Sequence, residues 1–162
     1  MYAVLVLAFA LGTWMSSGGR RSLQLAASAL VVFALINQVN LAYFPLHMRG
    51  AEHTATDTMH VIFTAVTGLL MLLVVFFGAI HYGTHFRLYS TITVILLLVF
   101  GSLAGIDGPK LHTNEPTPWM GIAERINVYA YMLWVIVFAV RLFRRGKRSV
   151  VIEQPLATVV NN

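Results

Sequence analysis

The stretch DTMHVIFTAVTGLLMLLVVFFGAIHY, residues 57–82, decides the fold of this chain. Apart from two histidines, its only acidic or basic residue is Asp57, and it is apolar over most of its length. A helix needs about 20 mainly apolar residues to cross the roughly 30 Å hydrocarbon core of a bilayer. The stretch therefore predicts a transmembrane helix.

The rest of the chain has the same apolar character. Of its 162 residues, 58% are hydrophobic and 10% are charged. In a typical soluble domain about 45–50% of the residues are apolar and about 25% are charged. So few charged residues would not cover the surface of a water-soluble domain. Cysteine is absent, which excludes disulfides and cysteine-ligated metals. Further apolar stretches lie at about Tyr2–Ser17, Leu23–Leu46, Leu88–Ile106 and Gly121–Phe143. We predict an all-α, polytopic transmembrane helical bundle of about five spans, the first of them short.

The positions of the basic residues predict the orientation of the bundle. Eight of the eleven fall in the first and third loops or near the C-terminus: Arg20, Arg21, Arg87, Arg141, Arg144, Arg145, Lys147 and Arg148. Cytoplasmic loops carry an excess of lysine and arginine. We therefore expect a bundle domain at residues 1–146 and a short cytoplasmic tail at residues 147–162, in a prokaryotic inner (cell) membrane with the N-terminus outside. The charge of +5 then reflects orientation, and we expect no nucleic-acid partner.

Polar side chains gather at the outer end of this predicted bundle. Five of the six acids and four of the six histidines lie in or beside the second and fourth loops. We expect a ligand pocket here, because the remainder of the membrane domain is apolar. The candidate pocket residues are Asn37, Asn40, His47, Arg49, Asp107, His112, Glu124 and Arg125.

Two groups of these candidates have alternative interpretations. Asn37 and Asn40 share a face of the second helix with His47, and carboxamides in hydrocarbon need partners, so they either join helices or contact a ligand. Arg125 lies about one turn inside the fifth helix. We expect it to pair with a carboxylate, or to hold a phosphate or carboxylate headgroup. Its candidate carboxylate partners are Asp57, Glu124 and Asp107.

A divalent metal ion such as zinc is a further prediction. On the predicted third helix, His53, Asp57 and His60 fall at i, i+4 and i+7, which stacks them on one face. Two imidazoles and a carboxylate suit zinc, with open positions for water or substrate. In the simpler interpretation, Asp57 favours the positive end of the helix and His60 hydrogen-bonds to a neighbouring helix.

Three short motifs resemble a known family. Tyr43-Phe44-Pro45 closes one helix, His60 opens the next, and Gly121-Ile-Ala-Glu-Arg125 opens the last. This pattern resembles the bacterial and archaeal membrane family called domain of unknown function 998, which is distantly similar to the Frag1/DRAM/Sfk1 group. The resemblance covers roughly residues 23–145 and implies about six helices. Because the chain offers five, we expect either a missing upstream helix or a misassigned start. The resemblance implies no reaction.

These observations leave the activity open between an enzyme and a binding protein. We favour a small bundle whose outer pocket binds membrane lipid, a small ligand or a protein partner. The protein partner could be a second copy of this chain. An alternative is a metal-dependent hydrolase acting at the outer leaflet, with His112 or His47 completing the metal set. A further alternative is haem-based electron transfer, with His60 and His47 as axial ligands.

Overall fold

The computed structural model describes the backbone of residues 2–80 and 82–160 and the side chains of residues 2–80 and 82–145. The described residues form helices and no strand, which confirms the all-α prediction. The elements are α1 (Tyr2–Met15), α2 (Arg21–Tyr43), α3 (Ala55–Ala79), α4 (Thr84–Asp107), the 3-10 helix η1 (Gly108–Leu111) and α5 (Met120–Val160).

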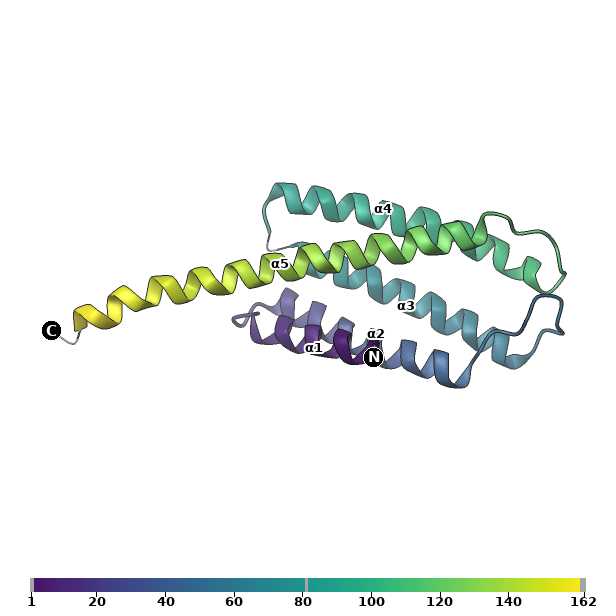
Figure 1. Cartoon of the computed structure of the whole chain (residues 1–162), viewed down its shortest axis with the longest axis horizontal. Coiled ribbons are helices and arrows are strands. Elements are labelled where there is room, and N and C mark those ends of the chain that lie inside the picture. Colours follow the sequence, from purple (N-terminus) through teal and green to yellow (C-terminus); the bar gives the residue numbers. More distant parts are fainter. Residues whose placement is uncertain (1, 81, 161–162) are drawn as a thin grey trace.

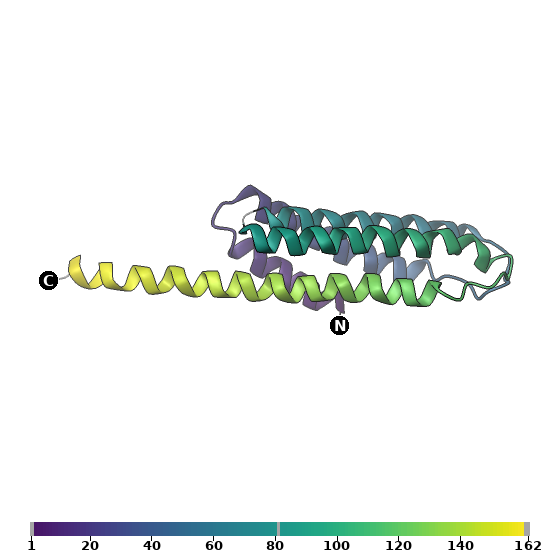
Figure 2. The same cartoon turned by 90° about the horizontal axis from the view of Figure 1, so that it is seen from above.

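The five α-helices of the described residues alternate in direction along an elongated bundle (Figure 1). The α1–α2 and α3–α4 connections lie at one end, and the α2–α3 and α4–α5 connections lie at the other, which we call the loop end (Figure 1). Seen after a 90° turn, α5 runs along one side of the bundle and extends past the other helices away from the loop end (Figure 2). The two loops that have most of the acids in or beside them therefore lie at one end, as predicted.

Within the part of the chain that the structure describes, four helices are long and apolar enough to cross a membrane: α2, α3, α4 with η1, and α5 as far as Arg145. The 14 residues of α1 extend only about 21 Å, so α1 is the short first helix that the sequence predicted. The last helix continues beyond its predicted end at Phe143 and includes residues 147–160 of the predicted tail. Residues 161–162 lie outside the described residues.

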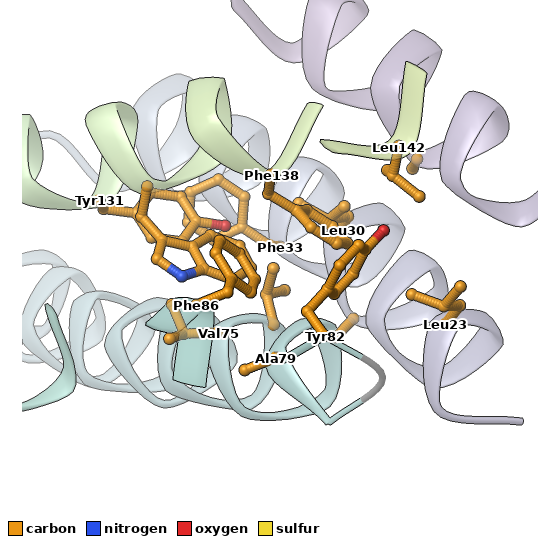
Figure 3. Packing of buried hydrophobic residues seen from close by; sticks show 14 of the residues in the cluster. Leu23, Leu30, Phe33, Val75, Ala79, Tyr82, Phe86, Tyr131, Phe138 and Leu142 are labelled. Atoms are coloured by element: carbon orange, nitrogen blue, oxygen red, sulfur yellow. The ribbon is translucent and has the colours of Figure 1, made fainter. Parts of the chain in front are cut away.

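An aromatic cluster joins the helices in the half of the bundle away from the loop end. Trp134 of α5 is fully buried, and its ring centre lies 4.9 Å from that of Phe138 and 5.8 Å from that of Phe86 of α4. The indole Nε1 of Trp134 donates a hydrogen bond to Oγ of Ser90 at 2.8 Å. Phe9 of α1 meets the same cluster, with its ring centre 5.8 Å from that of Phe138. Figure 3 shows how the rings of Phe86 and Phe138 fill the space between α4 and α5.

A glycine on α3 allows this cluster to form. A Cβ atom at Gly78 would lie 2.7 Å from Cη2 of Trp134 and 3.2 Å from Cζ of Phe138. These distances are shorter than ordinary carbon contacts of about 3.5–4.0 Å. The position thus has room for a hydrogen atom only, and the absence of a side chain lets α3 and α5 approach closely.

Candidate functional site

The loop end is organised around the buried carboxylate of Asp57. Its oxygens accept hydrogen bonds from the backbone N and Oγ1 of Thr54, at 2.9 and 2.8 Å, and from the backbone N of His47 at 2.9 Å. The ring Nδ1 of His47 lies 3.0 Å from Oδ1, and this contact is a hydrogen bond when Nδ1 carries the proton. Thr54 is the N-cap of α3 and forms a capping box with Asp57. The carboxylate therefore holds the start of α3 against the loop that follows α2.

His60 makes a second connection between the same helices. Its Nδ1 lies 2.7 Å from the carbonyl O of Phe44, the residue that caps the C-terminus of α2. This contact and the capping role of Asp57 match the simpler interpretation, in which Asp57 favours the positive end of the helix and His60 hydrogen-bonds to a neighbouring helix.

The predicted common face of His53, Asp57 and His60 is wrong. Helix α3 begins at Ala55, so His53 lies outside the helix and the helical spacing does not apply to it. Among the described residues, no three histidine, aspartate or glutamate side chains lie close enough to hold one metal ion. Binding of zinc by this chain stays a prediction.

Contacts between the two loops form what we call the loop clasp. The guanidinium of Arg49 donates to the carbonyl O of Glu115 and to the hydroxyl of Thr117. The backbone N of Gly50 donates to the carbonyl O of Leu111 at 2.9 Å. The rings of His53 and His112 meet edge to face, with their centres 4.4 Å apart. We define the clasp as these seven residues: Arg49, Gly50, His53, Leu111, His112, Glu115 and Thr117.

Asp107 lies beside the clasp rather than in it. Its Oδ1 is 2.7 Å from Nζ of Lys110, one turn further along η1. Neither this ion pair nor the one between His47 and Asp57 includes Arg125. The predicted pairing of Arg125 with Asp57, Glu124 or Asp107 is therefore not found among the described residues.

A shallow groove lies on α5 near the loop end. Glu124, Arg125, Val128 and Tyr129 line about 240 Å³ of space. All four side chains are exposed, and Nη1 of Arg125 donates to the carbonyl O of Gly121 at 3.2 Å. The groove thus combines a cation and an anion with one apolar and one aromatic side chain, all on a membrane helix.

Buried polar atoms also lie inside the bundle, between the loop end and the aromatic cluster. Asn40 is buried and donates from Nδ2 to Oγ1 of Thr64 at 3.3 Å, which leaves its Oδ1 without a partner in the described residues. Oδ1 of Asn127 and the hydroxyl of Tyr131 also lack described partners. A buried polar atom in hydrocarbon is costly when unpaired. These atoms can therefore accept hydrogen bonds from a ligand or from water.

Tyr131 was not among the sequence candidates. Its ring meets Phe33 of α2, with centres 5.8 Å apart, in the aromatic layer of Figure 3. Its position one helical turn after Asn127 was the signal that could have identified it. Asn37, the other predicted amide, is half-buried on α2.

Four long apolar helices, a short first helix and a polar loop end define a small polytopic integral membrane protein. The chain belongs to the family described as protein of unknown function, DUF998, whose model matches residues 1–141. This match reaches from α1 into α5 and confirms the family resemblance. No curated protein and no solved structure matches the chain. The more distant similarity to the Frag1/DRAM/Sfk1 group stays a prediction.

Proposed function

We propose that this membrane protein binds a phospholipid through the groove on α5. The observation that carries the proposal is the combination, on one face of a membrane helix, of charged Glu124 and Arg125 with Val128 and Tyr129. A phospholipid has the same division into a charged head and an apolar chain. Lipid binding is one of the activities that the sequence predicted for this end of the bundle.

Arg125 is the proposed contact for the lipid phosphate. A guanidinium carries five N–H donors, and the bond to Gly121 O uses one of them. Phosphate oxygens accept paired hydrogen bonds from arginine in a fork geometry. The exposed side chains of Val128 and Tyr129, one turn further along α5, supply an apolar surface for the start of an acyl chain.

Asn127 and Tyr131 extend the proposed site toward the bundle interior. Asn127 lies between the groove residues Arg125 and Val128 in the sequence, Tyr131 follows Tyr129 by two residues, and each has a polar atom without a described partner. Pairing a buried polar atom removes a penalty of about 1–3 kcal/mol. A lipid glycerol or headgroup that donates hydrogen bonds to these atoms would therefore be stabilised.

We also propose that the loop end faces outward from the cell membrane. The support is the placement of Arg20 and Arg87 at the opposite end, since cytoplasmic ends are rich in basic residues. The absence of native cysteine makes the orientation easy to test. Thr113→Cys in intact cells should react with a membrane-impermeant maleimide, and Ser16→Cys should not. The reverse pattern would refute the orientation.

The lipid proposal is tested by lipid mass spectrometry and by titration with phosphatidylglycerol and phosphatidylethanolamine in detergent. Arg125→Ala removes charge-assisted hydrogen bonds of about 1.5–3 kcal/mol, so we expect a roughly 10- to 100-fold loss of affinity. Arg21→Ala is the matched control, because Arg21 is exposed at the opposite end of the bundle. Equal lipid binding by the two variants, or none by the wild type, would refute the proposal. The hydrolase and haem alternatives stay predictions.

A further inference from the structure

The edge-to-face pair of His53 and His112 has the separation of two ligands on one metal ion. Their ring centres are 4.4 Å apart and the planes are inclined at 77°. Two imidazoles bound at about 2.0–2.1 Å to the same ion would have ring centres roughly 4.5 Å apart for bonds at right angles, and roughly 5.2 Å apart for tetrahedral bonds. The observed distance between the ring centres is therefore close to that of two imidazoles that bind one ion at right angles.

The backbone on both sides of this pair is already anchored. Gly50, three residues before His53, donates to the carbonyl O of Leu111, which directly precedes His112. Thr54, directly after His53, is held by the capping carboxylate through its backbone N at 2.9 Å. The backbone N of His112 donates to Pro109 O at 3.2 Å. Binding an ion would thus require little further ordering of either loop, and ordering is a main cost of association.

The charges around the pair permit a cation to approach. Lys110, the nearest lysine in the sequence, is paired with Asp107 at 2.7 Å. Arg49 directs its guanidinium to Glu115 O and Thr117. Glu52 is exposed directly before His53 and adds negative charge to the loop.

We propose that His53 and His112 form a two-imidazole site for a divalent transition-metal ion that joins the α2–α3 and α4–α5 loops. Imidazole suits Cu²⁺, Ni²⁺ and Zn²⁺, and water would fill the open positions. The sequence predicted His53 in a metal set with Asp57 and His60, which His112 or His47 would complete, and the present site keeps only His53 and His112. Asp57 is fully buried and engaged with His47 and Thr54, so its oxygens do not face this ion. The site is independent of the lipid groove.

The experiment uses the full chain in detergent, purified through a tag without histidine. Titration of the metal-free protein with Cu²⁺ should give one saturable site, and electron paramagnetic resonance should show two coordinated imidazole nitrogens. His53→Gln and His112→Gln should each leave one nitrogen. Removing a residue that only hydrogen-bonds to a metal ligand lowers metal affinity about 10- to 100-fold. Removing a ligand itself, as each of these variants does, should lower the Cu²⁺ affinity by at least that factor. His85→Gln, an exposed histidine at the opposite end of the bundle, is the matched control and should bind as the wild type does.

Three results would overturn the site. The first is wild-type affinity in both the His53→Gln and His112→Gln variants. The second is loss of binding in His60→Gln, which would place the ion elsewhere. The third is a wild-type resonance spectrum without two imidazole nitrogens, and this measurement needs no variant to fold. As a second measure, Zn²⁺ should raise the Tm of the wild type, because an ion that binds the native state stabilises it. It should not raise the Tm of a variant that carries both His53→Gln and His112→Gln.

Discussion

Replacing Gly78 with alanine is expected to destabilise the bundle. The added methyl would lie 2.7 Å from Cη2 of Trp134, about 1 Å closer than ordinary carbon atoms approach. Trp134 has little freedom to withdraw, because it is fully buried, stacks on Phe138 at 4.9 Å and is hydrogen-bonded to Ser90 at 2.8 Å. The overlap must therefore be relieved by a shift of helices or by a strained side-chain rotamer.

The expected magnitude comes from comparing two glycines on the same helix. Extra volume in a packed core costs about 1–3 kcal/mol, while glycine to alanine in a helix gains about 0.8–1.0 kcal/mol. Gly68→Ala is the matched control, because a Cβ at Gly68 meets no atom within 4 Å. Both variants share the gain in helix propensity, so the difference in stability between them measures the overlap alone.

The assay is thermal unfolding in one detergent, followed by circular dichroism. With a Tm change of about 2–4 °C per kcal/mol for a chain of this size, Gly78→Ala should unfold roughly 2–12 °C below Gly68→Ala. Adding Trp134→Phe to Gly78→Ala should recover part of the loss, since phenylalanine lacks the overlapping outer ring. A Gly78→Ala protein as stable as Gly68→Ala would refute this account of the contact between α3 and α5.

Three further changes test other parts of the structure. Trp134→Phe by itself removes the hydrogen-bond donor to Ser90 and leaves a cavity. It should lower the free energy of unfolding by at least about 1–3 kcal/mol. An unchanged Tm would contradict the packing described. Asp57→Asn removes an acceptor oxygen that holds the start of α3, so amide hydrogen exchange in the first turn of α3 should accelerate while exchange at mid-helix stays unchanged. Gly50→Ala places a side chain at φ +79°, which should cost about 1–2 kcal/mol. Gly83→Ala, at φ −61°, is its control in thermal unfolding.

The helices were largely predictable because each depends on its own stretch of sequence. The stretch 57–82 predicted a span that the structure has at Ala55–Ala79, and the short first helix was expected from its length. Helix ends were less predictable. The predicted start of the third helix at Asp57 missed the N-cap at Thr54, and α5 continues well past the apolar residues that predicted it.

The site was predictable in its location and less so in its contacts. The sequence placed the acids and histidines at one end, and the structure brings His47, His60 and Asp57 into contacts with the α2–α3 connection there. The sequence named His112 only as one of two histidines that could complete a metal set with His53. Their direct contact was not predictable, since they lie on different loops and no periodicity relates them. The pairing of Arg125 with an acid was an expectation from charge alone, and charge does not say which way a side chain on a helix points.

By itself, the sequence determined that this chain is a helical membrane protein, because hydropathy and span length are properties of single segments that the bilayer acts on directly. The tertiary structure alone decided which polar groups meet. That outcome depends on where each helix ends and on how the connections cross the loop end. The spacing of apolar residues within one segment predicts neither. A start of α3 at Ala55 takes His53 out of the helix and leaves it in the loop, beside His112.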